Sequence, residues 1–524
     1  MIKQTIPFKE IAGMSIEHAV NSSSIHHASK ERSKILGQQS ADVIKATMSS
    51  LHLSDIQQAH LNALSSGTAS IVITGQQPGF LGGPLYSLYK AITCISIAES
   101  YSTDESPVIP VFWIEDNDHD GMEAGIGTII DSNGALHSIG CDELEILQSR
   151  MSVSERTFSE DISNIIQHIS TLLPNTEYGQ SIVHELQEIY RPGISWSTAF
   201  LTLMHHRCSE YGLLFFSASK ARTLGLFSEI LYDELSNPGK LKSCVDIAND
   251  ELAHKNLPIQ SEAGMINAFY HDENGNRLKV EYIDETTRRI GERVFSISDM
   301  EQFFKEHNNQ FSPNVLLRPL IQDSILPTIA MIVGPGEAKY MAQLPHAYAT
   351  YAIPMPHLFS RHSSTVIPPS IEKYVNKYDL NVQSFFKTMN EIEQELSEKF
   401  AHDDEIDASF NELRSAIATS IGTIQHFANS IDPSLQGAVS ATEHGIEKQL
   451  ENLQKKMTSG LKKKHDQLFL KAHEAHNWLY PNNHLQERVL CSVAIESKLG
   501  IQGLRGVLLE MKQADRGEHL IVIS

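Results

Sequence analysis

The chain has 524 residues, of which 41% are hydrophobic, and it carries a formal net charge of −22. Because domains usually hold roughly 100–200 residues, about three structural units are expected. The negative charge argues against nucleic acid and anionic membranes as partners, since both are bound through basic surfaces. It does not exclude a small anionic substrate, because the charge in one pocket can differ from that of the whole molecule.

The cysteines number five, and no two of them are spaced as C-x-x-C, so neither a disulfide framework nor a zinc ribbon is expected. The amino-terminal sequence lacks the apolar core of a signal peptide, and no apolar run approaches the roughly 18 residues of a membrane span. We therefore expect a cytoplasmic protein that does not cross a membrane.

Short apolar runs alternate with helical patterns over the first 360 residues. The predicted strands are 70–74, 108–114, 212–217, 328–333 and 357–360, and the predicted helices are 85–100, 220–235 and 338–348. This alternation is typical of an α/β fold with a parallel sheet. Ligands of such sheets bind at the carboxyl ends of the strands, so the segments that follow these strands are the ones to search.

Two β-rich insertions interrupt this pattern. The first covers 126–138 with a turn at Asn133-Gly134, and the second covers 265–295 with a turn at Asn274-Gly275. Asn-Gly between alternating residues is a strong signal for a hairpin. A helical stretch at 154–190 follows the first insertion.

Beyond residue 370 the pattern becomes helical with a 4-3 spacing of apolar residues, which is typical of a coiled coil. Asp432-Pro433 interrupts it, which predicts a long antiparallel helical hairpin; an amphipathic bundle packed on the core is the alternative. The apolar positions are Phe385, Met389, Ile392, Leu396, Ile406, Phe410, Leu413, Ile417, Ile421, Ile424, Ile446, Leu450, Leu453, Met457 and Leu461. The last residues, 520–523, again have the pattern of a strand.

The first candidate site is the glycine-rich loop 74–84, which lies between a strand and a helix. Glycines let the backbone approach a ligand, and a helix N-terminus presents free N–H groups, so the loop predicts a phosphate or carboxylate site. It has neither the Gly-Lys-Ser/Thr ending of a Walker loop nor the G-x-G-x-x-G spacing. Gln76 and Gln77 offer donors and acceptors to a polar ligand. The alternative is a tight turn in which the glycines only satisfy geometry.

The second candidate site is the acidic run 115–120, directly after an apolar strand that ends near Trp113. Like charges this close require a cation, protonation or solvent. Asp118, His119 and Asp120 are suited to bind Mg²⁺, hold an ammonium group or act as a general base. A solvated acidic turn is the alternative.

Two further loops contain arginines that are candidate ligand-binding residues. Arg318 is a candidate clamp for a carboxylate or phosphate, and Gly334 and Gly336 form a second glycine-rich turn. A structural pair between Arg318 and Asp323 is the alternative. In the loop at 360–365, Arg361 is followed by hydroxyl side chains that suit phosphate oxygens, and a helix cap is the alternative.

Together these blocks resemble one family, the bacillithiol biosynthesis cysteine-adding enzymes, which are cysteine ligases. The matching pieces appear in the family's order and span nearly the whole chain. They are Thr74-Gly75-Gln76-Gln77, Gly83-Pro84-Leu85-Tyr86, Pro110-Val111-Phe112-Trp113-Ile114, Asp118-His119-Asp120, Leu317-Arg318-Pro319, Gln322-Asp323, Leu326-Pro327-Thr328, Gly334-Pro335-Gly336-Glu337, Arg361 with Ser363, and Leu485-Gln486-Glu487-Arg488. The sequence departs from the family at Asn117 and Gly121, where Glu and Phe are usual.

The resemblance implies a Rossmann-like core over 1–370 with insertions at about 126–195 and 262–310. It also implies a helical coiled-coil domain over 371–479 that supports a homodimer, and a segment over 480–524 that returns to the core. The implied reaction joins L-cysteine to glucosaminyl malate, the last step in making bacillithiol or a related low-molecular-weight thiol.

Forming an amide in water is uphill, so the cysteine carboxylate must be activated, and ATP is the expected co-substrate, with Mg²⁺ as a possible companion. Residues of the catalytic group are then Asp118, His119, Asp120, Arg318 and Arg361, with Asp118 and Asp120 as the metal candidates. The substrate- and nucleotide-binding group is Thr74, Gly75, Gln76, Gln77, Gly79, Gly83, Trp113, Gln322, Asp323, Gly334, Gly336, Glu337, Ser363 and Ser364. Two other functions stay open: an adenylate-forming nucleotidyltransferase that resembles an aminoacyl synthetase, and a non-catalytic coiled-coil scaffold.

Overall fold

The computed structural model describes residues 2–7, 22–140, 149–399, 403–515 and 517–523. The chain divides into two compact units. The first comprises Met1–Pro369 and His484–Ser524, and the second is Ser370–Asn483. The candidate loops of the sequence all belong to the first unit. In the described part of the chain, no helix is both long enough and apolar enough to cross a membrane.

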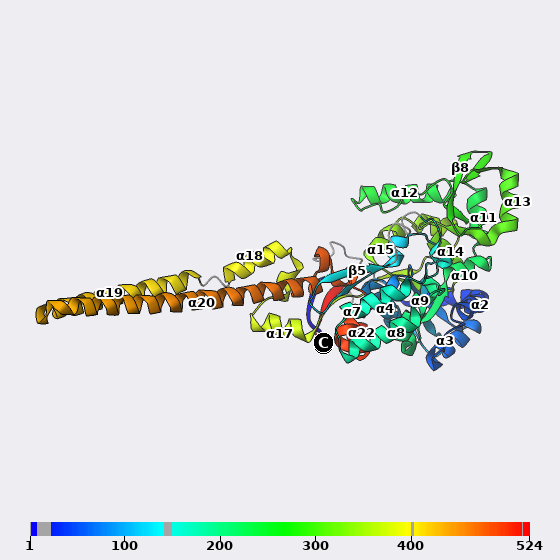
Figure 1. Ribbon diagram of the computed structural model, residues 1–524. Coiled ribbons are helices and arrows are strands. Elements are labelled where there is room, and N and C mark those ends of the chain that lie inside the picture. The colour runs from blue at the N-terminus through cyan, green and yellow to red at the C-terminus, as the bar shows by residue number, and fades with distance from the viewer. Residues whose placement is uncertain (1, 8–21, 141–148, 400–402, 516, 524) are drawn as a thin grey trace. The chain divides into compact units, whose positions relative to one another are not determined.

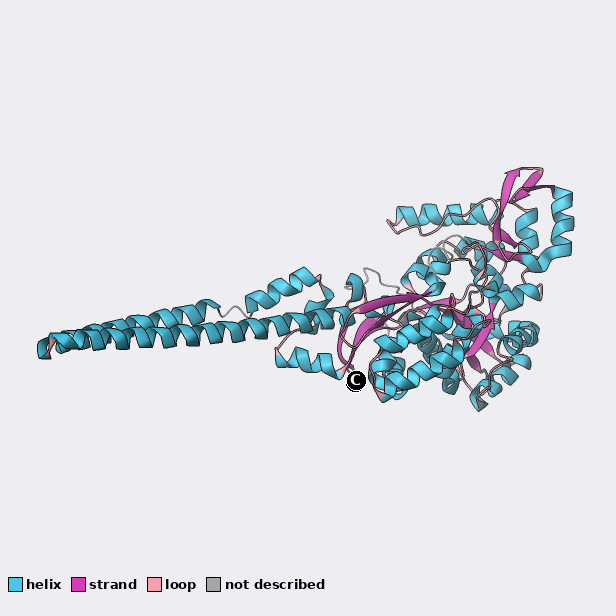
Figure 2. Ribbon diagram, in the orientation of Figure 1, coloured by secondary structure: helices cyan, strands magenta, loops and turns pink. Residues whose placement is uncertain are grey.

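A five-stranded parallel sheet forms the centre of the first unit, and its strands are drawn in magenta in Figure 2. Its order is β13-β12-β2-β3-β6, with bounds His357–Ser360, Thr328–Val333, Ser70–Gln76, Val108–Ile114 and Leu214–Ser217. Helices α4 (Leu85–Tyr101) and α2 (Ser22–Thr47) pack against it. The predicted strands and the α/β class with a Rossmann-like core are confirmed.

The order of the strands creates a switch point. From β2 the chain proceeds outward to β3 and β6, and it then returns to the other side of β2 to form β12 and β13. In open α/β sheets the crevice at such a reversal, outside the carboxyl ends of the strands, is where ligands bind. The turns that follow β2 and β12 therefore face the natural ligand position.

Burial explains why these strands can be predicted from the sequence. Every residue of β3 is buried, as is β2 up to Gly75, because helices cover the sheet. Such strands are continuous apolar runs rather than alternating ones. Trp113 at the end of β3 stacks on Phe216 at 5.0 Å and on Phe227 at 6.3 Å between ring centroids. Its indole is therefore part of the core packing.

The first insertion begins with a two-stranded hairpin of β4 (Ile126–Ile130) and β5 (Leu136–Gly140), which turns at the predicted Asn133-Gly134. Residues 141–148 lie outside the described residues. The helices that follow are α7 (Ile162–Leu172), α8 (Glu177–Ile189) and α9 (Trp196–Cys208). Their apolar faces form one hydrophobic core with Phe80 and Leu81 of the glycine-rich loop. This packing holds the loop in place.

The second insertion forms a five-stranded antiparallel sheet, after which the chain returns to the core. Its order is β10-β9-β8-β7-β11, with bounds Arg293–Ser296, Thr287–Ile290, Arg277–Asp284, Ala268–His271 and Phe311–Pro313. Helix α13 (Ile297–His307) connects β10 to β11. The sequence predicts the hairpin at Asn274-Gly275 but not β11, which is only three residues long.

A third sheet joins both ends of the chain, with β15 (Glu518–Ile523) between β1 (Ile2–Pro7) and β14 (Ser363–Ile367). The predicted strand at 520–523 is therefore confirmed, whereas β1 is not predicted. Other helices of the first unit are α3 (Asp55–Ser65), α5 (Gly121–Gly125), α10 (Ala218–Thr223), α11 (Ser228–Ser236), α12 (Lys240–His254), α14 (Arg318–Ile325), α15 (Pro335–Met341), α16 (Pro345–Thr350), α21 (Gln486–Val489) and α22 (Ser492–Gln513). The predicted helices 220–235 and 338–348 are each two shorter helices.

The second unit consists of helices, including α18 (Met389–Lys399), α19 (Asp403–Ile431) and α20 (Gln436–Leu479). Helices α19 and α20 form the predicted hairpin, labelled in Figure 1, and the chain reverses between them at Asp432-Pro433. Arg414 of α19 pairs with Glu447 of α20 at 2.9 Å. The 4-3 apolar spacing thus predicts the arms of the hairpin correctly.

Candidate functional site

A cleft of about 580 Å³ opens at the carboxyl ends of β2, β3 and β12. It lies at the switch point of the sheet, and the second insertion and α21 supply part of its walls. Predicted site residues that line it are Gly75, Gln76, Gln77, Trp113, Asp118, Asp120, Arg318, Gly334, Gly336, Glu337 and Arg361. Lining residues absent from the predicted site include Tyr86, Lys90, Glu115, Glu123, Phe269, Arg277, Asn314, Tyr340 and Arg488.

The predicted site residues that do not line the cleft are Thr74, Gly79, Gly83, His119, Gln322, Asp323, Ser363 and Ser364. Thr74 Oγ1 donates to the carbonyl oxygen of Ile332 (3.1 Å), which ties β2 to β12. Asp323 is buried and accepts from Tyr348 Oη (2.5 Å) and from Gln322 Nε2 (3.1 Å). The suggested pair between Arg318 and Asp323 is therefore absent, and Asp323 serves the packing of α14.

The glycine-rich loop reaches the cleft only through its first residues. A Cβ on Gly75 would lie 2.8 Å from the carbonyl oxygen of Trp113, so the close pairing of β2 and β3 requires glycine there. A Cβ on Gly79 would lie 2.6 Å from Gly83 Cα, which makes these two a tight structural turn. At the start of α4, the Leu85 N–H donates to the Leu490 carbonyl oxygen (2.8 Å). The expectation that this helix N-terminus offers free N–H groups to an anion is therefore wrong for Leu85.

Lys90 links the two glycine turns from within α4. Its ammonium group donates to the Gly75 carbonyl oxygen (2.8 Å) and Gln76 Oε1 (2.9 Å), and it pairs with Glu337 Oε2 (2.5 Å). Glu337 in turn accepts from the Gly334 N–H (2.8 Å) at the start of α15. Burial lowers the pKa of Lys90, and Glu337 opposes that shift. The turns after β2 and β12 are thus held together across the switch point.

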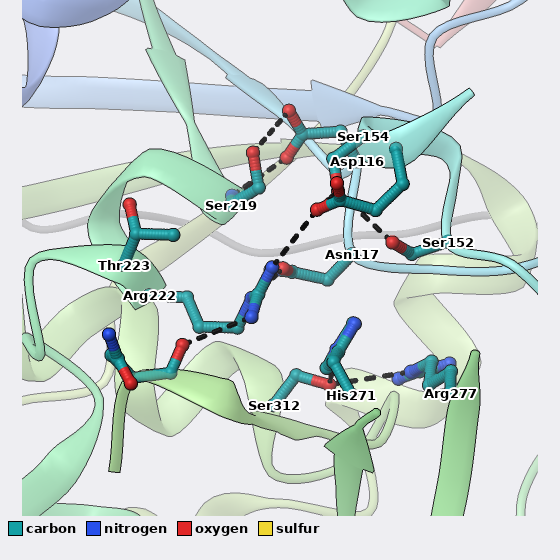
Figure 3. Close-up of polar contacts among 12 residues, drawn as sticks. Asp116, Asn117, Ser152, Ser154, Ser219, Arg222, Thr223, His271, Arg277 and Ser312 are labelled. Carbon is teal, nitrogen blue, oxygen red and sulfur yellow. Dashed lines mark hydrogen bonds and ion pairs between the residues drawn. The ribbon is translucent and has the colours of Figure 1, made fainter. Parts of the chain in front are cut away.

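The acidic loop after β3 is stable because different partners hold its successive residues. Glu115 accepts from Trp113 Nε1 (2.8 Å). Asp116 accepts from the Ser219 N–H (2.7 Å) and from Ser217 Oγ (2.9 Å), at the start of α10. These hydrogen bonds compensate charges that would otherwise be costly to bury. Figure 3 shows Asp116 and Ser219 in contact.

The next two residues are each held by an arginine. Asn117 Oδ1 accepts from Arg222 Nε (2.8 Å), and Asp118 Oδ1 accepts from Arg277 Nη1 (2.7 Å). Asn117 is buried and does not line the cleft, so its contact with Arg222 supports the loop from below the cleft surface. The solvated acidic turn suggested by the sequence applies only to the end of the run, where Asp120 is exposed.

Asp118 is engaged at both oxygens. Its Oδ2 accepts from Gln77 Nε2 (2.9 Å), and its Oδ1 also accepts from the His119 N–H (2.8 Å). Burial disfavours its charge, yet the hydrogen bond from His119 and the charge of Arg277 hold the pKa of Asp118 well below its ordinary value. This carboxylate stays ionised and its acceptors are occupied. Among the described residues, no group of three or more His, Cys, Asp or Glu side chains could hold a metal ion.

Glu123 is a further carboxylate that lines the cleft. Its Oε1 accepts from Gln76 Nε2 (2.7 Å) and Tyr86 Oη (3.3 Å) at the cleft wall. Glu123 is an exposed residue, but the partial loss of water around its carboxylate raises its pKa, and the charge of the neighbouring Asp120 adds to the shift. The sequence signal for it is weak, because it is one more acid in the first turn of a short helix.

The arginines that line the cleft differ in whether their charge is already paired with a carboxylate of the protein. Arg318 is 9% exposed, and its guanidinium donates to Gln322 Oε1 (2.9 Å) and Tyr340 Oη (2.7 Å). In the part of the chain that the structure describes, no carboxylate lies within ion-pair distance of it. Burial disfavours its charge, yet Tyr340 and Glu115 raise the pKa of Arg318 above its ordinary value. Arg318 is therefore a buried cation that neighbouring groups stabilise at a distance, and because it has no direct ion pair among the described residues it can also attract an anion in the cleft.

Arg361 and its neighbours form a closed network instead. Arg361 Nη2 pairs with the fully buried Glu487 (2.6 Å). Glu487 Oε2 also accepts from Ser363 Oγ (2.9 Å) and from the Ser364 N–H (2.9 Å). The predicted hydroxyl site for phosphate thus surrounds a carboxylate of the protein. Arg488, the next residue, is exposed at the cleft and has no ion pair among the described residues.

The family model described as "Bacillithiol biosynthesis BshC, N-terminal Rossmann-like domain" matches residues 15–362. The chain belongs to the BshC family. A second model, "Bacillithiol biosynthesis BshC, C-terminal coiled-coil domain", matches residues 364–524. In this BshC chain most of the cleft comes from the first match. Arg488 comes from the second match, although the structure places it in the first compact unit.

Curated relatives share the same name, "Putative cysteine ligase BshC". The relative from Chlorobaculum tepidum is 31% identical over 90% of this BshC chain and 85% of its own length. The relative from Chlorobium phaeobacteroides is 30% identical over 90% and 85%, and that from Salinibacter ruber is 28% identical over 84% and 80%. The predicted family is therefore confirmed.

Proposed function

We propose that this BshC chain is a ligase that joins L-cysteine to glucosaminyl malate, the last step in making bacillithiol or a related low-molecular-weight thiol. The names of its relatives support a cysteine ligase. The observation that carries the proposal is Arg318, a buried cation at the switch point that lines the cleft and has no direct ion pair among the described residues. A ligand with carboxylates or phosphates would form charge-assisted hydrogen bonds with this guanidinium.

The cleft carries both kinds of charge that the reaction needs. Arg318 and Arg488 would hold anionic groups of malate or of a nucleotide. Gly336 adds room on that side, because a Cβ there would meet no atom within 4 Å. Glu115, Asp120 and Glu123 lie on the acidic wall and would hold an ammonium group. This arrangement would bring the amine of one substrate near the activated carboxylate of the other, and such positioning contributes strongly to rate.

ATP would activate the cysteine carboxylate, since amide formation in water is otherwise uphill. Mg²⁺ would accompany its phosphates. Asp118 does not fit as a metal ligand because its oxygens are occupied by Arg277, Gln77 and His119. Asp120 is left as a single exposed carboxylate, and we assign no step to a metal ion held by the protein.

Product formation tests the proposal. Purified protein is incubated with cysteine, glucosaminyl malate, ATP and Mg²⁺ under reducing conditions, and the amide is sought by mass spectrometry. We expect ATP-dependent product and its loss in Arg318→Met. Arg289→Met is the matched control, because Arg289 lies on β9 in an exposed pair with Glu281 (2.6 Å). No product from the wild type, or full activity of Arg318→Met, would contradict the proposal. Release of phosphate or of pyrophosphate identifies which bond of ATP breaks.

We also propose a cytoplasmic homodimer formed through the second unit. Its helices expose large apolar side chains, including Ile424, Phe427 and Ile431 with exposed fractions of 51%, 62% and 77%. An apolar stripe on a long helical hairpin suits a second copy of the same hairpin. Light scattering should give twice the chain mass for the wild type and a monomer for Phe427→Lys. Leu224→Lys, in the first unit and 58% exposed, is the control that should stay dimeric.

A further inference from the structure

Arg277 comes from the second insertion and ends against the acidic loop of the core. It is the first residue of β8, and its side chain is 8% exposed. Nη1 donates to Asp118 Oδ1 (2.7 Å), Nη2 donates to the Pro313 carbonyl oxygen (2.6 Å), and the guanidinium stacks on Phe269 at 3.9 Å. Figure 3 shows its contact with Ser312, which comes from β11 of the same sheet. One arginine thus joins the inserted sheet to the loop after β3.

The contact continues from Asp118 to the glycine-rich loop. Asp118 accepts from Gln77 Nε2 (2.9 Å) through its other oxygen, so the Gln77 side chain has its orientation set by a carboxylate that Arg277 holds. Arg277 also lies close enough to Glu115 for their charges to interact. It is therefore the buried counter-charge for Asp118 and Glu115, at the acidic run where the sequence leaves open a metal ion, a bound ammonium group or a general base.

We propose that Arg277 is a positioning residue of the ligase site, which rests on the function proposed above. It holds the Asp118 carboxylate, and through it the Gln77 amide, on the cleft wall. It acts through Asp118, with no contact to the reacting atoms. In this way the inserted sheet completes the geometry of the Rossmann-like core.

Two physical points make the role specific to arginine. Removing one partner of a buried ion pair leaves the other charge uncompensated, so the acidic loop must shift or take up a proton. Lysine would supply the charge but not the fork that reaches Asp118 and the Pro313 carbonyl oxygen together. Arg277→Lys should therefore restore only part of what Arg277→Met loses.

A double-mutant cycle tests whether Arg277 acts through Asp118. We expect Arg277→Met and Asp118→Asn each to lower kcat/KM by about tenfold or more. The kcat/KM of the double variant should lie within about twofold of that of the less active single variant. Equal effects of Arg277→Met in both backgrounds would overturn the proposal, because they would show a role independent of Asp118. Unchanged activity of Arg277→Met would also overturn it. Arg289→Met on the neighbouring strand should match the wild type.

Hydrogen exchange gives a readout that does not depend on the reaction. In Arg277→Met, exchange at residues 115–120 should rise at least about threefold while the central strand β2 keeps its protection, since only a local opening is expected. Unchanged exchange at residues 115–120 would overturn the proposal. A wild type that makes no product counts against the proposed function instead, and the exchange measurement then decides the positioning role by itself.

Discussion

Lys90 and Glu337 form an ion pair of 2.5 Å beside the switch point of the central sheet, with side-chain exposures of 4% and 19%. One residue lies in α4 after the first glycine turn, and the other lies in α15 after the second. The pair joins the two turns, and residues of both turns line the cleft. Its lysine also holds Gly75 and Gln76, so no hydrogen of the ammonium group is left for a ligand.

Lys90→Met should destabilise the fold by about 3 kcal/mol, because it leaves Glu337 beside buried surface without its cation. Chemical unfolding followed by circular dichroism measures this change. Lys242→Met is the matched control, since Lys242 pairs with Asp246 (2.5 Å) at an exposed site, where such pairs contribute about 0–1 kcal/mol. Equal destabilisation by the two variants would contradict the buried role of Lys90.

Arg488→Met should weaken substrate binding without affecting stability. Arg488 is exposed at the cleft and has no ion pair among the described residues, so its charge is available to an anion. We expect KM for glucosaminyl malate or ATP to rise by about tenfold, the loss of roughly 1.4 kcal/mol of binding free energy, with an unchanged melting temperature. Steady-state kinetics with each substrate varied in turn shows which anion it contacts. Arg191→Met, at another exposed arginine, should leave both KM values unchanged.

The central sheet and the helical hairpin are predictable from the sequence because their signals are local. Strands β3, β12 and β13 have the predicted bounds, since continuous apolar runs end at polar or glycine-rich turns. The turns after β2 and β12 are found in the same way. The break between α10 and α11 is missed because Gly225 is a single glycine in a helical pattern.

Residues that reach the cleft from distant segments have no such local signal. Arg277 meets Asp118 across 159 positions, and nothing in the hairpin sequence indicates that contact. The hydroxyl side chains after Arg361 are predicted to bind phosphate for the same reason. Ser363 instead donates to Glu487, which lies 124 positions away in the sequence. Pairings of this kind depend on the topology of the sheet, which the local pattern does not contain.

Asn117→Ala should reduce stability but leave the chemistry nearly intact. Arg222 is 4% exposed and donates to Asn117, so loss of this acceptor leaves a buried donor unsatisfied at a cost of about 1–3 kcal/mol. The side chain does not line the cleft, so KM should stay within about twofold at temperatures where the variant is folded. Asn117→Asp, which keeps an acceptor for Arg222, is the control and should retain stability. A large rise in KM for Asn117→Ala with normal stability would instead place residue 117 in substrate binding.

Glu234 should make stability fall as the pH rises toward neutrality. It is fully buried and accepts from the Asn267 N–H and Nδ2 (both 2.8 Å), and burial raises its pKa from 4.5 to about 7. The folded chain therefore holds this proton more tightly than the unfolded chain. The resulting stability is fully present below about pH 4.5 and is lost as the pH rises to about 7, a change of about 3 kcal/mol.

Glu234→Gln removes this titration and keeps an oxygen that accepts from Asn267. Its free energy of unfolding should lie within about 1 kcal/mol of the wild type at pH 5 and exceed it by about 3 kcal/mol at pH 8. Urea unfolding at a series of pH values measures the difference between the two proteins, which cancels the contribution of all other titrating groups. Glu229→Gln, at an exposed position of the same helix α11, is the control and should follow the wild-type curve. Parallel curves for Glu234→Gln and the wild type would show that Glu234 is ionised in the folded protein at both pH values, with its buried charge balanced by the amide of Asn267.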